Sequence, residues 1–427
     1  MKEQSLRMDV EIVAIGNELL LGETVDTNSA YAARRLAEIG ARVSRVTVVG
    51  DDRERMRQAL EEARERSRWV ITTGGLGPTQ DDLTRQVVAE VFDAPLEVDA
   101  EVLAVVEERF RRFGYAKMPP SNLCQAEVPR GARVIPNRHG TAPGLVIESG
   151  GGSTFFVLPG VPAEMRALLE EGVLPVLVAA NGDAAPVVRS RTVHTAGIGE
   201  SALAERLQEV LAETSPIEVA FLPHLGMVDV RLTLAGHSRV EADRRLEALA
   251  GEVVRLSTPW YYGIDGDTLP QAVGRELLAR GWKVAVAESM TSGELGAELT
   301  SVAGSSAWFV GGILAYANEA KEALLGVPRE TLARHGAVSE ETCCAMLVGA
   351  RRALRVEVAC AVTGIAGPAG GSEEKPVGLV WIGVETPAGT EVRKLDYPGG
   401  RREVRRRATV AALALLWRQL QPTGAEG

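Results

Sequence analysis

Apolar and polar positions along residues 8–180 switch repeatedly between short apolar runs and segments with helical spacing. The apolar runs predict buried strands at residues 10–15, 43–49, 69–73, 144–147 and 154–158. Apolar positions three and four residues apart predict helices at residues 27–39, 53–66 and 162–178. Because strands alternate with helices, the first domain is expected to be a parallel sheet of βαβ units, of the α/β class.

The order of elements changes after residues 181–186, whose sequence NGDAAP is typical of a linker. A β-α-β-β-α pattern follows, with strands expected at residues 191–195, 217–222 and 227–234 and helices at residues 201–212 and 239–256. This order predicts a small α+β domain.

A second break is expected at residues 261–267, and α/β alternation then resumes. The main elements expected in this last region are helices at residues 269–280, 293–299 and 403–420 and strands at residues 283–287 and 356–362. The chain of 427 residues is long enough for three domains, which we expect at residues 8–180, 186–259 and 265–421.

Composition narrows the class of protein. The 47 basic and 57 acidic side chains give a net charge of −10, and no long basic stretch suits a nucleic-acid backbone, so no nucleic-acid partner is expected. The apolar runs are shorter than the roughly 20 residues of a membrane helix, and the start of the chain does not have the pattern of a signal peptide. The four cysteines include no Cys-x-x-Cys pair, which favours a cytoplasmic location.

A glycine-rich loop directly follows the strand predicted at residues 69–73. Gly74, Gly75 and Gly77 allow backbone N–H groups to approach a phosphate. The loop lacks the lysine of a P-loop, but Asp81 and Asp82 offer oxygens that suit a divalent cation. The alternative is a structural glycine turn followed by acidic residues that cap a helix.

Two other polar loops follow strands of the same sheet. The first contains Glu18 and leads on to Asn28, and the second contains Glu164. Open α/β sheets bind ligands where loops leave the carboxyl ends of strands, so we expect these loops to converge on the glycine-rich loop.

The last domain contains a candidate nucleophile. Ser289 lies at a strand-to-helix turn, where helix N–H groups can stabilise an oxyanion, although a serine in such a turn is more commonly a helix cap. A serine nucleophile needs a base, and Lys321 is a candidate, with Tyr316 to orient or relay the proton. Only six of the 47 basic residues are lysines, and arginine cannot serve as a base, which favours a specific role for Lys321.

Further loops of the last domain offer ligand-binding groups. Thr363, Gly364 and Gly367 follow an apolar strand and provide hydroxyl and backbone donors for a phosphate or carboxamide. Arg401 and Arg405 begin a basic segment and are candidates for a phosphate clamp, the alternative being a solvated helix face. The domain's one histidine, His335, is expected to be structural.

Several sequence blocks closely resemble the CinA family. In the first half they are GNELLLGETVDTNS, TTGGLGPTQDDLT, RHGTAPG, LPGVPAEM and TAGIGES, and residues 267–420 resemble the nicotinamide-nucleotide amidohydrolase domain of the same family. The resemblance implies a molybdopterin-binding-like αβα first domain, a small α+β middle domain and a C-terminal α/β deamidase domain.

The resemblance also implies two activities. The first domain would be a metal-dependent pyrophosphatase that cleaves ADP-ribose to AMP and ribose 5-phosphate, with the carboxylates of Asp81, Asp82, Glu18 and Glu164 as candidate ligands of a divalent ion. The last domain would hydrolyse nicotinamide mononucleotide (NMN) to nicotinate mononucleotide and ammonia without a cofactor, through Ser289. A homodimer is expected.

The sequence departs from the family pattern in two motifs, and an alternative function is also possible for the chain. Met290 and Ser292 replace a cysteine and a glycine of Glu-Ser-Cys-Thr-Gly-Gly, and Gly400 replaces the aspartate of Pro-Gly-Asp-Arg. Since Ser289 and Lys321 remain, an active deamidase is predicted. The alternative is a competence-associated regulatory protein that binds a pterin or nucleotide and has one or both sites inactive.

Overall fold

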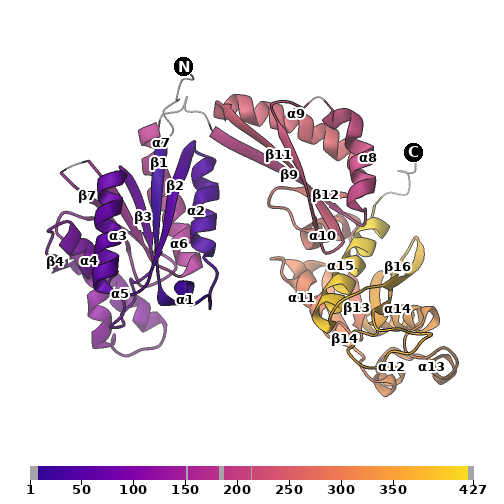
Figure 1. Cartoon of the computed structure of the whole chain (residues 1–427). Coiled ribbons are helices and arrows are strands. Elements are labelled where there is room, and N and C mark those ends of the chain that lie inside the picture. The colour runs from indigo at the N-terminus through magenta and orange to yellow at the C-terminus, as the bar shows by residue number, and fades with distance from the viewer. Residues whose placement is uncertain (1–7, 151, 182–186, 213, 422–427) are drawn as a thin grey trace. The chain divides into compact units, whose positions relative to one another are not determined.

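A computed structural model describes residues 8–150, 152–181, 187–212 and 214–421 (Figure 1). The chain forms two compact units, Met1–Arg189 with Leu234–Arg244 and Ser190–Thr233 with Arg245–Gly427. Within the described ranges, no helix combines the length and the apolar character that crossing a membrane requires.

The first domain is built on a six-stranded sheet with the order β2-β1-β3-β8-β7-β6. Its strands are β1 (Met8–Ile15), β2 (Ala41–Val49), β3 (Trp69–Thr73), β6 (Arg133–Ile135), β7 (Gly144–Glu148) and β8 (Thr154–Leu158). The first four strands in this order are parallel, and β7 and β6 are antiparallel to their neighbours. The α/β prediction is therefore confirmed, with an antiparallel edge that the sequence pattern did not reveal.

Helices cover both faces of this sheet (Figure 1). One face packs against α3 (Arg53–Arg66), α4 (Thr84–Val91) and α5 (Ala100–Arg112), and the other against α2 (Thr27–Ala37), α6 (Pro162–Leu168) and α7 (Leu174–Asn181). Successive residues of a strand point to opposite faces of the sheet, so Val70 packs against the first set of helices and Ile71 against the second. The smaller elements are α1 (Asn17–Leu20), β4 (Leu96–Val98), η1 (Pro120–Ala126), β5 (Glu127–Pro129) and η2 (Leu169–Val173).

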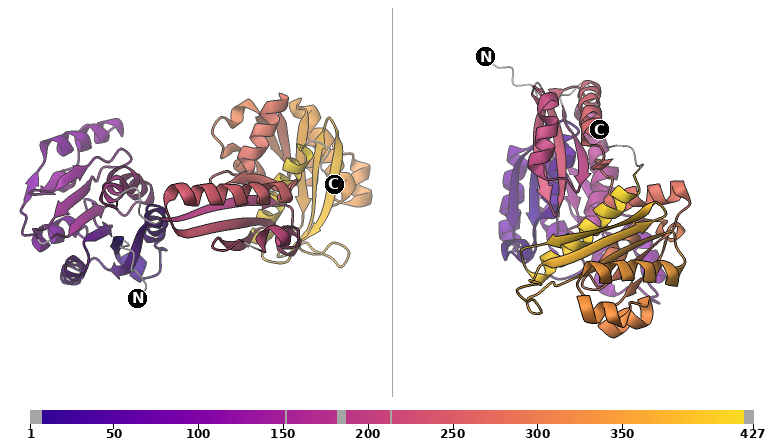
Figure 2. Two further views of the ribbon diagram at one scale, coloured as in Figure 1. Left: turned by 90° about the horizontal axis from the view of Figure 1, so that it is seen from above. Right: turned by 90° about the vertical axis from the view of Figure 1, so that its right-hand side faces the viewer.

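The middle domain is a four-stranded sheet with the order β10-β11-β9-β12 and two helices. Its elements are β9 (Val187–Ala196), α8 (Glu200–Leu211), β10 (Glu218–His224), β11 (Met227–His237), α9 (Arg239–Ser257) and β12 (Tyr261–Ile264). Figure 2 shows α9 running along the strands. The α+β prediction is confirmed, but the predicted break at residues 261–267 was wrong in part, because β12 pairs antiparallel with β9. Residues 182–186 of the predicted linker lie outside the described residues.

The last domain has a five-stranded sheet with the order β14-β13-β15-β16-β17. The strands are β13 (Val284–Glu288), β14 (Phe309–Leu314), β15 (Val358–Gly364), β16 (Leu379–Thr386) and β17 (Gly389–Asp396). Strands β14, β13 and β15 are parallel, and β16 and β17 are antiparallel to their neighbours.

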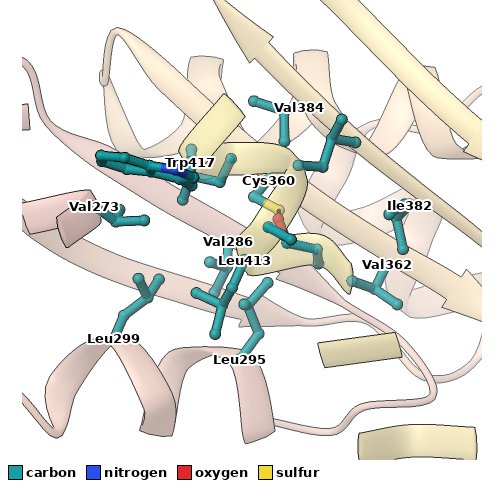
Figure 3. Close-up of a cluster of buried hydrophobic side chains, with 14 of the residues drawn as sticks. Val273, Val286, Leu295, Leu299, Cys360, Val362, Ile382, Val384, Leu413 and Trp417 are labelled. Carbon is teal, nitrogen blue, oxygen red and sulfur yellow. Dashed lines mark hydrogen bonds between the residues drawn. The ribbon is translucent and has the colours of Figure 1, made fainter. Parts of the chain in front are cut away.

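Two helical layers enclose this second sheet. One layer consists of α10 (Leu269–Arg280), α11 (Glu294–Thr300) and α15 (Arg401–Gln419), and the other of α12 (Asn318–Leu325), α13 (Arg329–His335) and α14 (Glu340–Leu354), with η3 (Ser305–Ala307) before β14. Valines and Cys360 face the first layer, where Leu413 and Trp417 of α15 meet them (Figure 3). Ala359 and Ala361 of β15 face α14 instead. This packing fixes the carboxyl end of β13, from which Ser289 emerges.

Candidate functional site

The three polar loops of the first domain converge on one cavity of about 450 Å³. Its walls include the glycine-rich loop Gly74–Gly77 and the four candidate carboxylates of Glu18, Asp81, Asp82 and Glu164. The cavity lies at the carboxyl ends of β1, β3 and β8, where an open α/β sheet binds ligands. Asn28 is not part of this wall, because its Nδ2 donates to the carbonyl of Gly160 at 2.7 Å and so supports the loop from behind.

The candidate carboxylates do not form a preassembled metal site. No three His, Cys, Asp or Glu side chains among the described residues are grouped so that they could hold an ion. Asp82 accepts hydrogen bonds from the N–H and hydroxyl of Thr79 and so stabilises the loop. It does not cap the following helix as the structural alternative predicted, because the N-cap residue of α4 is Leu83 and no described side chain caps it. Carboxylate oxygens of this kind suit a divalent cation chemically, and Mg²⁺ is usually held by only one or two carboxylates together with phosphate oxygens and water.

Glu164 is held by a residue that the sequence did not single out. Asn137 donates through Nδ2 to Glu164 at 2.6 Å and to the carbonyl of Ala142 at 2.7 Å, while its Oδ1 accepts from the N–H groups of His139 and Gly140. Burial raises the pKa of Glu164, although the hydrogen bond from Asn137 opposes this change. A carboxyl group with a raised pKa at a cavity wall is suited to exchange a proton with a ligand.

In the last domain, the predicted nucleophile and base meet. Ser289 directly follows β13, whereas Lys321 lies in α12, which follows β14. The Nζ atom of Lys321 is nevertheless 3.1 Å from the Oγ atom of Ser289. The side chain of Lys321 is 1% exposed, and its Nζ also donates to the carbonyls of Ala315 at 2.8 Å and Tyr316 at 3.0 Å. Ser289 does not cap α11, which begins at Glu294.

The environment of Lys321 disfavours its charged form. Burial lowers the pKa of Lys321, and within the described ranges no carboxylate forms an ion pair with it. Two of its three partners are carbonyls, which can only accept hydrogen bonds. A neutral amine has two N–H donors for these carbonyls and one lone pair, which can accept the Ser289 hydroxyl.

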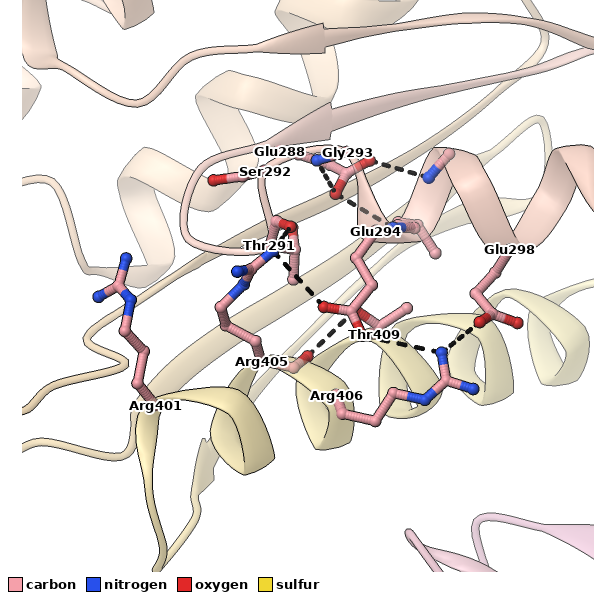
Figure 4. Close-up of polar contacts among 12 residues, drawn as sticks. Glu288, Thr291, Ser292, Gly293, Glu294, Glu298, Arg401, Arg405, Arg406 and Thr409 are labelled. Carbon is pink, nitrogen blue, oxygen red and sulfur yellow. Dashed lines mark hydrogen bonds and ion pairs between the residues drawn. The ribbon is translucent and has the colours of Figure 1, made fainter. Parts of the chain in front are cut away.

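The N–H groups at the start of α11 are not the oxyanion donors that the sequence suggested. The carboxylate of Glu288, 1% exposed, accepts from the N–H groups of Gly293 at 3.0 Å, Leu295 at 3.1 Å and Gly296 at 2.9 Å (Figure 4). The N–H groups of the buried residues Met290 and Thr291 instead have no acceptor among the residues described. Because buried N–H groups normally have partners, these two are the better candidates to bind an oxyanion beside Ser289.

The remaining predicted residues of this site have varied roles. The exposed phenol of Tyr316 accepts a hydrogen bond from Arg401 Nη2 at 3.3 Å, so it is the Tyr316 carbonyl, not the phenol, that contacts Lys321. Thr363 donates its hydroxyl hydrogen to the carbonyl of Ala337 at 2.7 Å, which leaves only its oxygen lone pairs for a ligand.

The two predicted arginines differ in whether their guanidinium groups are free to bind a ligand. Arg401 donates to the carbonyl of Gly367 at 2.8 Å and remains exposed, so its other N–H groups can reach a phosphate. Gly364 is half-buried at the end of β15. Arg405 donates to the carbonyl of Thr291 at 2.7 Å and lies 3.7 Å from Glu294, so it supports the Ser289 turn (Figure 4).

Ser292, Lys375 and His335 are further polar residues of the last domain. Ser292 adopts a φ of 51°, the left-handed conformation that favours the glycine of the family pattern, and it retains the turn through hydrogen bonds to the Ser289 carbonyl. Lys375 donates to the carbonyls of His335 and Val338 and is structural. His335 pairs with Glu341 at 3.0 Å. No contact between His335 and Ser289 occurs among the described residues, so a Ser-His-Asp triad is not formed.

Three family models match the chain. They are described as "Probable molybdopterin binding domain" (residues 11–179), "Damage-inducible protein CinA KH domain" (residues 190–263) and "CinA C-terminal domain" (residues 266–420). A CinA-like protein of Gemmatimonas aurantiaca is 45% identical over 412 residues, which are 96% of this chain and 96% of that protein. The chain belongs to the CinA family.

Similarity to other CinA-like proteins also extends over almost the full length. The CinA-like protein of Gloeothece citriformis is 42% identical over 93% of this chain and 94% of its own length. A solved structure of the protein CinA from Thermoplasma acidophilum, 37% identical, covers 40% of this chain and 98% of that chain with a TM-score of 0.37. The predicted CinA resemblance is therefore confirmed, as is the α/β, α+β, α/β succession of domains, with a KH-type middle domain.

Proposed function

We propose that the last domain is an amidohydrolase that converts NMN to nicotinate mononucleotide and ammonia. The observation that carries this proposal is the buried pair of Ser289 and Lys321, whose side-chain Oγ and Nζ atoms are 3.1 Å apart. A buried lysine with a lowered pKa is a suitable base for a serine nucleophile. The carboxamide of NMN supplies a carbon that such a nucleophile can attack.

The proposed reaction begins with neutral Lys321. Ser289 Oγ forms a bond to the carboxamide carbon while its proton moves to Lys321 Nζ, and the developing oxyanion is bound by the N–H groups of Met290 and Thr291. The C–N bond then breaks, and the proton passes from Nζ to the departing nitrogen, which leaves as ammonia. Water attacks the resulting ester, gives its proton to Nζ, and nicotinate mononucleotide leaves as the proton returns to Ser289 Oγ.

The proposal is tested by ammonia release from NMN by the purified full chain. We expect Ser289→Ala to abolish release, because the alanine side chain has no hydroxyl with which to form the ester. Ser301→Ala is the matched control, since Ser301 is an exposed serine at the end of α11 that donates only to the Glu298 carbonyl. Ammonia release by Ser289→Ala at the wild-type rate, or none from folded wild type, would refute the amidohydrolase assignment.

We also propose that the first domain hydrolyses the pyrophosphate bond of ADP-ribose to give AMP and ribose 5-phosphate. The supporting observation is that one cavity joins the glycine-rich loop to five carboxylates, those of Asp51 and the four candidates, a combination suited to a phosphorylated ligand and a proton acceptor. The test is AMP formation from ADP-ribose, with and without EDTA and with divalent cations added back. Loss of AMP formation in EDTA would show that a metal is required, whereas absence of AMP under every condition would reject the assignment.

A further inference from the structure

The glycine-rich loop of the first domain is held from behind by the first two residues of α4. The hydroxyl of Thr84 donates to the carbonyl of Gly74 at 2.8 Å, and the Thr84 N–H donates to the carbonyl of Gly75 at 3.1 Å. Arg85 continues the series, because its Nη1 donates to the carbonyl of Leu76 at 2.6 Å and its Nη2 to that of Gly77 at 2.9 Å. Four successive carbonyls are thus bound by two adjacent side chains and one N–H group.

Since the carbonyls of the loop are bound, its backbone N–H groups are available to a ligand. The N–H groups of Gly75, Leu76 and Gly77 have no acceptor among the described residues, and all three residues line the cavity. Gly74 and Gly75 have φ values of 112° and 63°, which turn the chain so that successive N–H groups can point the same way. Successive unpaired N–H groups form a concave site for an anion.

The guanidinium of Arg85 also carries a charge that the protein does not neutralise. Arg85 is 1% exposed, and no carboxylate in the described part of the chain forms an ion pair with it. Its remaining contact is to Cys124 Sγ at 3.4 Å, and its Nε has no partner. Burial lowers the pKa of Arg85, with Cys124, Asp82 and Glu127 opposing the change, yet arginine stays protonated. A buried, unpaired cation is unfavourable unless an anion lies close by.

We propose that Arg85 is a positioning residue for phosphate in the first domain. It holds the carbonyls of Leu76 and Gly77 away from the cavity, so that the loop N–H groups face the ligand, and it places a positive charge behind them. This inference rests on the proposed ADP-ribose activity for the identity of the substrate, but it makes a separate claim about how any pyrophosphate binds.

The test is calorimetric titration of the full chain with inorganic pyrophosphate. We expect Arg85→Met to weaken binding about tenfold or more, because it removes two hydrogen bonds to the loop and the charge. Arg85→Gln keeps a donor without the charge, whereas Arg85→Lys keeps the charge, so affinity is expected to recover in the lysine variant more than in the glutamine variant. For ADP-ribose hydrolysis, the KM is expected to rise more than kcat falls.

The matched control is Arg64 of α3, which contacts the C-terminal end of α4. Arg64 donates to the carbonyl of Val91, the last residue of α4, and is half-buried but does not line the cavity. Arg64→Met is expected to lower thermal stability without changing pyrophosphate affinity. If Arg85→Met does not fold, the comparison of Arg85→Lys with Arg85→Gln still decides the outcome.

The outcomes separate this inference from the proposed activity. If wild type binds pyrophosphate in a way that depends on Arg85 but forms no AMP, the inference stands and the ADP-ribose activity fails. If Arg85→Met binds pyrophosphate as tightly as wild type, or Arg85→Gln as tightly as Arg85→Lys, the inference fails even if AMP is formed. Absence of pyrophosphate binding by wild type also overturns the inference.

Discussion

At the scale of single residues, the protonation state of Lys321 controls the proposed amidohydrolase. Burial lowers the pKa of Lys321 from its ordinary value of 10.5, and the amine acts as a base only when it is neutral. We therefore expect kcat/KM for NMN to rise with pH until the pH exceeds this lowered pKa, and to level off above it. Lys321→Arg keeps the charge but cannot accept the proton, so we expect at least about a 100-fold loss of kcat at every pH.

The measurement is the pH profile of ammonia release by wild type and Lys321→Arg. Lys375→Arg is the matched control, because Lys375 binds two carbonyls of the same domain but does not contact Ser289. Activity of Lys321→Arg equal to that of wild type would remove Lys321 from the role of base.

Individual residues also show what the sequence could and could not predict. Ser289 and Lys321 could be found because their types carry the chemistry and because lysine is scarce in this chain. Arg85, Asn137 and Glu288 could not, since each contacts backbone groups that only the folded loop brings to it. Asn28 was identified by the loop that precedes it, but its amide donates to Gly160 in the loop that contains Glu164 and does not line the cavity.

At the scale of elements, the turn between β13 and α11 depends on Glu288. The carboxylate accepts three N–H groups at the start of α11, where the helix dipole also favours a negative charge. We expect Glu288→Gln to lower the free energy of unfolding by about 1–3 kcal/mol, because the amide has only one accepting oxygen and no charge. NMN hydrolysis is expected to fall as well, since Ser289 is the next residue.

Urea unfolding followed by circular dichroism, together with ammonia release, tests this role of Glu288. The control is Glu298→Gln in the same helix, where the half-buried carboxylate pairs with Arg406 on the protein surface. A Glu288→Gln variant that unfolds at the same urea concentration as wild type would show that the capping hydrogen bonds contribute little.

The elements themselves were predictable to different degrees. The bounds of β3, β8, α3 and α10 agree with the sequence pattern because a polar residue, proline or glycine follows each of them. The strands β4, β5 and β6 have three residues each, which is too short to show a period of two. Strand β12 was interpreted as a break because its glycine and the following Asp-Gly suggest a turn, yet its pairing with β9 makes it a strand.

At the scale of the whole molecule, an acidic chain must bind phosphorylated ligands through local groups. The net charge of −10 repels NMN and ADP-ribose at long range. Each domain offers its own local donors, which are the glycine-rich loop with Arg85 in the first domain and the exposed Arg401 in the last. Composition therefore predicts no nucleic-acid partner, but it does not locate either of the proposed anion-binding groups.

The two candidate sites belong to different compact units, so their activities are expected to be separable. The cavity lies within Met1–Arg189, and Ser289 and Lys321 lie within Arg245–Gly427. We expect Asp82→Ala to abolish AMP formation, because it removes both a carboxylate of the cavity wall and the acceptor that holds Thr79, while NMN hydrolysis stays within about twofold of wild type. Ser289→Ala is expected to have the opposite effect. Both reactions are measured on each purified variant, and loss of both activities in either folded variant would show that the sites are coupled.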